Sequence, residues 1–182
     1  AIIGLAKDDE VLFAGIASDA AHIVVLTGGS EKTPPRALRF ETGAVNPQAT
    51  PTARGVAAIK VLDDPLVGAA LIEPNQFKQF VYLLSERGHL KRVSLEEFPV
   101  QGRGGQGVQV WKTNPATGML TALAVGKADV DLDILSEKGK RLRVSAKDVP
   151  QATRVTKGVD LGAKYAGGEL FPGEASEYLS AS

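Results

Sequence analysis

Short apolar runs separated by turn-forming residues are the dominant pattern along the chain. Residues 80–84 form an apolar and aromatic run, residues 86–89 have turn character, and residues 90–93 resume an extended pattern. Two such runs around a short turn predict a β-hairpin. Residues 108–111 largely alternate between apolar and polar side chains, which is typical of a half-buried strand. Residues 119–125 supply another strand.

Helical periodicity is weak throughout the sequence. The best helix candidate, residues 94–98, is barely one turn long, and long apolar stripes with capping residues are missing. The hydrophobic pattern therefore predicts an all-β protein.

An internal repeat organises these strands. Residues 84–94 read LSERGHLKRVS, and the segment 51 positions further on, residues 135–145, reads LSEKGKRLRVS. The same gapless offset relates Arg103 to Arg154, so the similarity extends beyond the hairpin. A fixed period of this length indicates a repeat architecture, and four strands in about 50 residues are typical of a propeller blade.

A weaker copy of the repeat lies upstream. Residues 22–27 resemble the first strand of the later hairpins, and Gly55 matches Gly107. We therefore expect one domain over residues 1–182, with repeats at about 22–61, 79–112 and 131–162.

Composition is typical of a folded protein of the reducing cytoplasm. Hydrophobic residues make up 43% of the 182 residues, and cysteine is absent, which excludes disulfide frameworks and thiolate metal sites. The longest apolar runs are far too short to span a bilayer, and no signal peptide is visible after Ala1. No membrane contact is predicted.

The charge distribution separates a basic body from acidic ends. The formal net charge is zero, but residues 1–20 and residues 165–182 each carry a net charge of −3. The residues between them hold 20 basic and 14 acidic side chains, a net charge of +6. This basic body suits a polyanionic partner, although the overall net charge on its own argues against one.

Enzyme chemistry finds little support in the sequence. The only two histidines, His22 in a predicted strand and His89 in a predicted turn, cannot build a three-histidine metal site. We expect His22 to be partly buried and His89 to be exposed. Gly102, Gly104 and Gly107 satisfy a bare G-x-G-x-x-G pattern, but no helix pattern follows them. No catalytic residue, metal site or cofactor is predicted.

The hairpin of residues 85–92 is followed by a glycine-rich box. The box consists of Gln101, Gly102, Arg103, Gly104, Gly105, Gln106 and Gly107. These motifs resemble the C-terminal domain of the A subunits of bacterial type IIA topoisomerases, DNA gyrase and topoisomerase IV. The box departs from that family's pattern at Gly102, where a second Arg is common, and at Gln106, where Lys is common. Residues 151–159 are similar to the degenerate box of other blades.

The resemblance implies a fold and a function. The family fold is a β-pinwheel, a propeller-like disc of five or six blades in which neighbouring blades exchange strands. This length holds three to four blades of about 51 residues, so we expect an open, unusually short or partial disc. By resemblance, the domain is not catalytic, and it bends or wraps double-stranded DNA for an ATP-dependent topoisomerase. The implied protein partners, in the cytoplasm at the nucleoid, are the rest of the A subunit, together with the ATPase B subunit.

Basic side chains in the equivalent turns and boxes are the candidate DNA contacts. Repeating a turn around a disc places its charges along one rim, where they can meet successive phosphates of a bent duplex without reading its sequence. The candidates are Arg87, Lys91, Arg92, Arg103, Lys112, Lys138, Lys140, Arg141, Arg143, Lys147, Arg154 and Lys157. The glycines of the box expose backbone amides to a phosphate, link neighbouring blades, or do both.

Two alternatives stay open at this stage. The chain could be a protein-interaction β-propeller that binds a partner through its edge or face, and a weak dependence on salt would distinguish this function from DNA binding. The acidic segment 165–182 could compete with DNA at the rim as a tethered anion, or it could pack on the last blade as a closing strand through Leu170, Phe171 and Tyr178.

Overall fold

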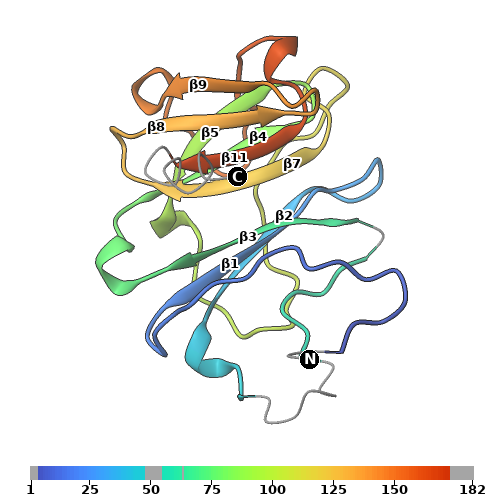
Figure 1. Cartoon of the computed structure of the whole chain (residues 1–182), viewed down its shortest axis with the longest axis vertical. Helices are drawn as coiled ribbons and strands as arrows, with labels where there is room; N and C mark the ends of the chain where they lie inside the picture. The colour runs from blue at the N-terminus through green and yellow to red at the C-terminus, as the bar shows by residue number, and fades with distance from the viewer. Residues whose placement is uncertain (1–3, 48–54, 63, 173–182) are drawn as a thin grey trace.

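The computed structural model describes residues 4–47, 55–62 and 64–172, which form three antiparallel sheets (Figure 1). The first sheet has the strand order β3 (Leu66–Ile72), β1 (His22–Thr27), β2 (Arg36–Glu41) and β6 (Val108–Gln109). The second has the order β7 (Leu120–Gly126), β4 (Phe80–Ser85), β5 (His89–Ser94) and β10 (Val159–Asp160). The third has the order β11 (Gly168–Pro172), β8 (Asp131–Ser136) and β9 (Arg141–Ser145).

Helical structure in the described residues is limited to single 3-10 turns. These are η1 (Thr42–Ala44), η2 (Pro74–Gln76), η3 (Leu95–Glu97), η4 (Ala146–Asp148) and η5 (Ala163–Tyr165). The all-β prediction is confirmed, and the one-turn helix candidate in residues 94–98 corresponds to η3.

Neighbouring sheets exchange strands. Strand β6 follows the β4–β5 hairpin in the chain, but it pairs with β2 of the first sheet, with Val108 opposite Ala37. Strand β10 follows the β8–β9 hairpin and pairs with β5 of the second sheet, with Val159 opposite Leu90. Each of these two sheets is thus completed by the next repeat, as a pinwheel requires.

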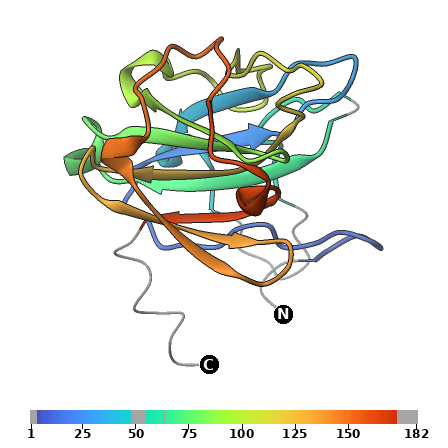
Figure 2. The ribbon, with the colours of Figure 1, turned by 90° about the horizontal axis from the view of Figure 1, so that it is seen from above.

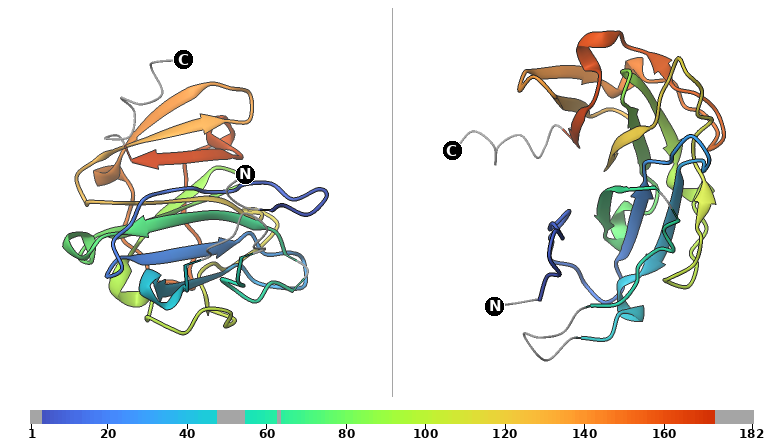
Figure 3. Two further views of the ribbon diagram at one scale, coloured as in Figure 1. Left: turned by 60° about the horizontal axis from the view of Figure 1, so that its bottom comes forward. Right: turned by 90° about the vertical axis from the view of Figure 1, so that its right-hand side faces the viewer.

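The three sheets form an open arc. Strand β7 lies between β3 and β11, so the inner edges of the three sheets run side by side, whereas β6 and β10 form outer edges (Figure 2). The right-hand view in Figure 3 shows the arc from the side, with the N-terminal segment on its concave face.

The core is shared between neighbouring sheets because β4 is buried on both faces. Val81 and Leu83 pack with Trp111 in one apolar cluster, whereas Tyr82 and Leu84 belong to the next cluster. Alternate residues of a strand point to opposite faces, so this one strand contributes to both cores. Burial on both faces explains why β4 is a continuous apolar run.

Glycine closes the two equivalent hairpin turns. Gly88 and Gly139 have φ angles of +78° and +72°, a left-handed conformation that glycine adopts at little cost. The prediction of matching turns in the two later repeats is confirmed by these angles and by the pairing of β4 with β5 and of β8 with β9.

Two local expectations were wrong. His89 is the first residue of β5 and is buried, because β10 from the next repeat pairs beside it through Asp160. The strand expected over residues 108–111 ends at Gln109. The next pair keeps one hydrogen bond, from the Val110 N–H to the Pro35 carbonyl at 3.0 Å, but Pro35 has no N–H to return the second bond.

The acidic segment contains a strand. Strand β11 pairs with β8 along its whole length, and Leu170 is buried in the apolar cluster between the second and third sheets, as the closing-strand interpretation expects. The remainder of the segment, residues 173–182 with Tyr178, lies outside the described residues.

Candidate nucleic-acid interface

The glycine-rich box, residues 101–107, carries the chain from the second sheet to the first; we call it the first box. The Gly104 N–H donates to the Ala58 carbonyl at 2.6 Å, and the Lys60 N–H donates to the Gly105 carbonyl at 2.8 Å. A Cβ at Gly107 would lie 2.3 Å from the Ala37 carbonyl oxygen, and its φ is +67°. The glycines therefore permit a close crossing between blades, and the Gly104 amide is already occupied.

Arg103 projects from the first box into solvent. Its guanidinium donates to the Ala57 carbonyl at 3.3 Å and to the Ala44 carbonyl at 3.4 Å. No carboxylate of the described residues lies within ion-pair distance of it. Its charge is therefore available to an external anion.

Residues 151–158, here called the second box, make the equivalent crossing from the third sheet to the second. The Ala152 N–H donates to the Arg92 carbonyl at 2.9 Å. The Arg154 N–H donates to the Glu97 carboxylate at 3.1 Å, and the Arg154 Nε lies 3.9 Å from the same oxygen. Glu97 ends η3 as Ala44 ends η1, so Arg154 has a counter-charge that Arg103 lacks.

Lys91 was expected on the rim, but it lies in the core. Its ammonium donates to the carbonyls of Thr153, Arg154 and Thr156, and it sits 4.9 Å from the centre of the Trp111 ring. The side chain has no solvent exposure, because the second box covers it. It is therefore not placed to meet a phosphate in this structure.

The arginine repeated in the second strand of each hairpin is used mainly inside the protein. Arg39 is buried, donates from Nε to His22 Nδ1 at 2.9 Å, and reaches the Leu95 carbonyl of the next repeat. Arg92 is half-buried and lies over the Phe80 ring, with its guanidinium carbon 5.2 Å from the ring centre.

Arg143 and its neighbour Arg141 share one buried carboxylate, that of Asp133. The distances are 2.7 Å from Arg141 and 3.0 Å from Arg143. Burial acts to raise the pKa of Asp133, but hydrogen bonds and charge from the two arginines outweigh it, and the pKa lies below its usual value. Half of the positive charge here is therefore compensated, although both arginine side chains remain substantially exposed.

The other candidates are exposed. Arg87 and Lys138 occupy the same place in the two equivalent turns, and Arg87 lies 4.0 Å from Glu86. Lys138 and Lys140 line a pocket of about 230 Å³ together with Lys164. The exposed candidates without an ion pair in the part of the chain that the structure describes are Arg103, Lys112, Lys138, Lys140, Lys147 and Lys157.

Sequence reasoning missed Lys60 and Lys164, both of which are exposed. Lys60 lies five residues after Gly55, as Lys112 lies five residues after Gly107. Extending the weak upstream repeat by this spacing would have identified Lys60.

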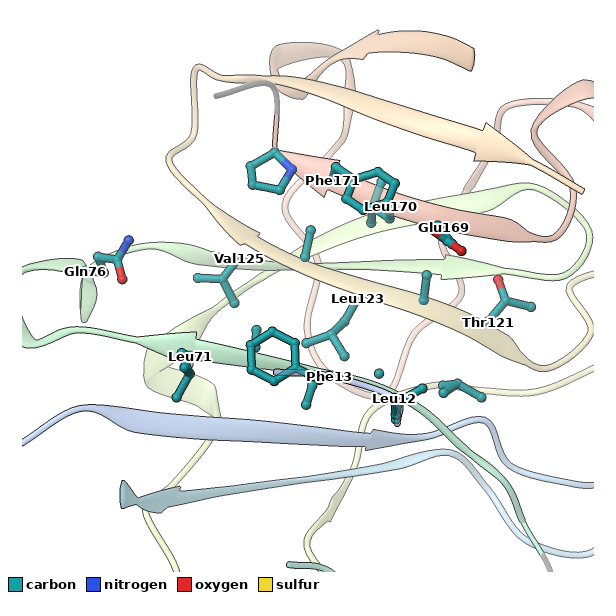
Figure 4. Close-up of a pocket in the computed structure, with 17 residues that line it drawn as sticks. Leu12, Phe13, Leu71, Gln76, Thr121, Leu123, Val125, Glu169, Leu170 and Phe171 are labelled. Atoms are coloured by element: carbon teal, nitrogen blue, oxygen red, sulfur yellow. The ribbon is translucent and has the colours of Figure 1, made fainter. Parts of the chain in front are cut away.

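The inner side of the arc has a different chemistry. A groove of about 490 Å³ runs between β3, β7 and β11 and is lined by Phe13, Leu71, Leu123 and Phe171 (Figure 4). Glu169 is the only charged residue among the described residues that line it. The basic boxes lie instead beside β6 and β10, at the outer edges of the sheets (Figure 3).

Antiparallel sheets that exchange strands around an open arc define a β-propeller of the pinwheel class. A family model described as the DNA gyrase C-terminal domain, a β-propeller, matches residues 79–125 and 134–163. The A subunit of DNA gyrase from Deinococcus deserti is 32% identical over 160 residues, which cover 86% of this chain and 19% of the relative. The corresponding protein of Mycobacterium leprae is 32% identical over 164 residues, which cover 87% of this chain and 12% of the relative. The chain belongs to the DNA gyrase A C-terminal domain family.

Solved structures share the fold. The crystal structure of the C-terminal domain of DNA topoisomerase IV has a TM-score of 0.81 at 19% identity, over 98% of this chain and 57% of that one. The structure of the DNA gyrase A C-terminal domain has a TM-score of 0.77 at 18% identity, over 94% and 57%. The chain thus spans little more than half of these solved domains, and a fifth or less of the two gyrase A relatives.

Two other kinds of feature are absent from the described residues. In these ranges, no group of three or more potential ligands could hold a metal ion. Across the same residues, no helix is long and apolar enough to cross a membrane.

Proposed function

We propose that this chain is a non-catalytic DNA-binding domain that bends or wraps duplex DNA along its outer side. One observation carries the proposal: exposed basic side chains recur at equivalent positions of successive repeats, Arg87 with Lys138 and Lys60 with Lys112, and the boxes add Arg103 and Lys157. We call this set the outer rim, and its members are Lys60, Arg87, Arg103, Lys112, Lys138 and Lys157. The inner groove, by contrast, is lined by no Lys or Arg among the described residues.

The chemistry of the outer rim suits phosphate. Lysine and arginine ion pairs with phosphate release counterions and supply affinity without reading the base sequence. Because the rim residues are distributed along an arc, a duplex that contacts several of them must bend toward the protein, and the added contacts offset the bending energy.

The family relation supports the biological setting. The relatives are A subunits of DNA gyrase, so we propose that the domain acts in the cytoplasm, at the nucleoid, with the rest of an A subunit, and that the B subunit is a further partner. We also propose that the three repeats work as one domain, since the apolar clusters are shared between neighbouring sheets.

A four-site substitution tests the proposal. The rim variant replaces with glutamine the residues Arg87, Arg103, Lys112 and Lys138. The control replaces with glutamine three exposed lysines that are not members of the rim, namely Lys7, Lys78 and Lys127. Affinity for a 40-base-pair duplex is measured by fluorescence anisotropy over a range of salt concentrations.

Each lost phosphate contact lowers the slope of log K against log salt by about 0.9, so the rim variant should lose about 3 to 4 units of slope. The control should retain nearly the wild-type slope. An unchanged slope in a folded rim variant would show that DNA does not bind through these residues.

The apolar inner groove favours a second function, that of a protein-interaction propeller. Leu12 and Phe13 of the N-terminal segment line this groove and are exposed. If binding a protein is the function, wild-type affinity for duplex DNA will be weak and equal in the rim variant and the control.

A further inference from the structure

The second box is built around a buried ammonium group. Lys91 Nζ lies 2.6 Å from the Arg154 carbonyl oxygen, 2.9 Å from that of Thr156 and 3.1 Å from that of Thr153. A lysine ammonium has three N–H donors, so these acceptors use its full capacity. The Trp111 ring face closes the site from the other side, with its centre 4.9 Å from Nζ.

The first box makes the same crossing without a buried charge: the half-buried Arg36 guanidinium donates to the carbonyls of Gln106 at 2.8 Å and Gly107 at 3.0 Å. Leu38 stands at the position of Lys91, because Leu38 pairs with Val25 of β1 as Lys91 pairs with Leu83 of β4. Ile59 packs with Leu38 beneath the first box. The backbone of that box is held by hydrogen bonds to residues 58–60. Only the second box is held by a buried lysine ammonium, which can lose its proton, whereas an arginine guanidinium keeps its charge.

Opposing effects act on the pKa of the Lys91 ammonium. Burial lowers the pKa of the Lys91 ammonium to about 7, while the Glu97 carboxylate acts to raise it. The three carbonyl acceptors and the Trp111 face also favour the charged form. The other charged or titratable groups on the elements around it lie on its own strand, on the two strands that pair with it, and on the second box. They are His89, Arg92, Tyr82 of β4, Asp160 of β10, Lys112 beside Trp111, Arg154 and Lys157.

We propose that Lys91 is a proton-dependent clamp that holds the second box in place and thereby positions Arg154 and Lys157 on the outer side. The protonated amine bonds all three carbonyls. The neutral amine has only two N–H donors and no charge to attract the carbonyl dipoles, so the clamp loosens as pH rises through the pKa of Lys91. The clamp itself does not require DNA; only its effect on binding rests on the proposed function.

The first test uses the wild-type chain without DNA. Nuclear magnetic resonance follows the Lys91 Nζ resonance between pH 5.5 and 9, and hydrogen exchange reports on the amides of residues 152–157 after correction for intrinsic rates. We expect one midpoint near pH 7 for both, with exchange about tenfold faster on the high-pH side. The amides of the first box serve as the internal control and should show no such step.

Three results would overturn the clamp. Lys91 could stay charged to pH 9, the exchange of residues 152–157 could be indifferent to its titration, or both boxes could loosen together. Each of these would mean that the second box is held by its other contacts.

A substitution separates the charge from the volume of the side chain. Lys91→Met should raise exchange in residues 152–157 at pH 6 by about tenfold and abolish the pH step. Leu38→Met at the equivalent position should leave both boxes unchanged, since it exchanges one apolar group for another of similar volume. If Lys91→Met does not fold, the wild-type pH series still decides the question.

A separate experiment tests the effect of the clamp on DNA binding. At matched ionic strength, wild-type affinity for the duplex should fall about threefold between pH 6 and pH 8.5, and Lys91→Met should show little pH dependence. A wild-type chain that binds no DNA at either pH would overturn the proposed function and leave the exchange result standing. Binding without pH dependence, together with a confirmed exchange step, would show that the second box does not contact DNA.

Discussion

The two boxes follow the same path through the fold and differ in how charge is used. In the first box, the backbone is held by backbone hydrogen bonds and by the half-buried Arg36 guanidinium, and Arg103 has no counter-charge. In the second box, the backbone surrounds Lys91, and Arg154 lies against Glu97. Arginines at equivalent positions of two repeats therefore differ in how much of their charge is available to an anion. We expect the first box to carry more of the interaction with phosphate.

The largest expected effect tests why the first box is rich in glycine. Gly107→Ala should destabilise the chain by about 3 kcal/mol, because the new Cβ meets the Ala37 carbonyl oxygen at a positive φ. Urea unfolding measures the change. Gly102→Ala is the matched control, since nothing lies within 4 Å of its added Cβ, and it should change stability by less than about 0.5 kcal/mol. Equal effects at the two positions would contradict the close-crossing explanation.

The third repeat shows what happens when an exposed pair of arginines has a buried counter-ion. Asp133→Asn should cost about 2 kcal/mol at pH 7, because two charged hydrogen-bond donors lose their carboxylate. The folded-state pKa of Asp133 lies below its unfolded value, so this stabilisation is present above about pH 4 and is lost as pH falls further. The free energies of unfolding of the wild type and the variant should therefore converge at acid pH. A constant difference down to pH 2 would contradict the assignment.

Single arginine substitutions compare the boxes directly. Arg103→Ala should weaken duplex binding about tenfold, and Arg154→Ala about twofold, because Glu97 already compensates part of the Arg154 charge. Anisotropy titrations at one salt concentration suffice. The reverse ranking would show that the second box is the principal contact.

The smallest expected effect comes from giving the first box the counter-charge of the second. Ala44→Glu introduces a carboxylate beside Arg103, at the place that Glu97 has beside Arg154, and should weaken DNA binding about threefold at low salt. Ala44→Gln is the neutral control and should bind as the wild type does. If the two variants bind alike, the charge environment of Arg103 does not govern affinity.

The repeat made much of the fold predictable. The 51-residue offset and the turn glycines fixed the positions of both later hairpins, and the resemblance supplied the strand exchange that β6 and β10 display. The length of a strand such as β6 was not accessible, since it depends on its partner: Pro35, opposite Val110, has no N–H to return a hydrogen bond.

The site was less predictable because burial here is created by the neighbouring repeat. Lys91 looks exposed within its own hairpin, and only the second box, about 60 residues further along the chain, covers it. A comparison of the repeats could have indicated that this position is buried, because the equivalent positions carry the apolar residues Leu38 and Leu142. The sequence around Arg143 did not indicate that the Asp133 carboxylate would compensate one of the two charges of Arg141 and Arg143.

The central claim is that duplex DNA binds this chain through phosphate contacts along the outer rim. The most direct measurement is the salt dependence of wild-type affinity for two duplexes of equal length and unrelated sequence. The account predicts linear plots of log K against log salt with the same slope for both, of about −4 or steeper. A slope near zero, or binding confined to one of the two sequences, would contradict it.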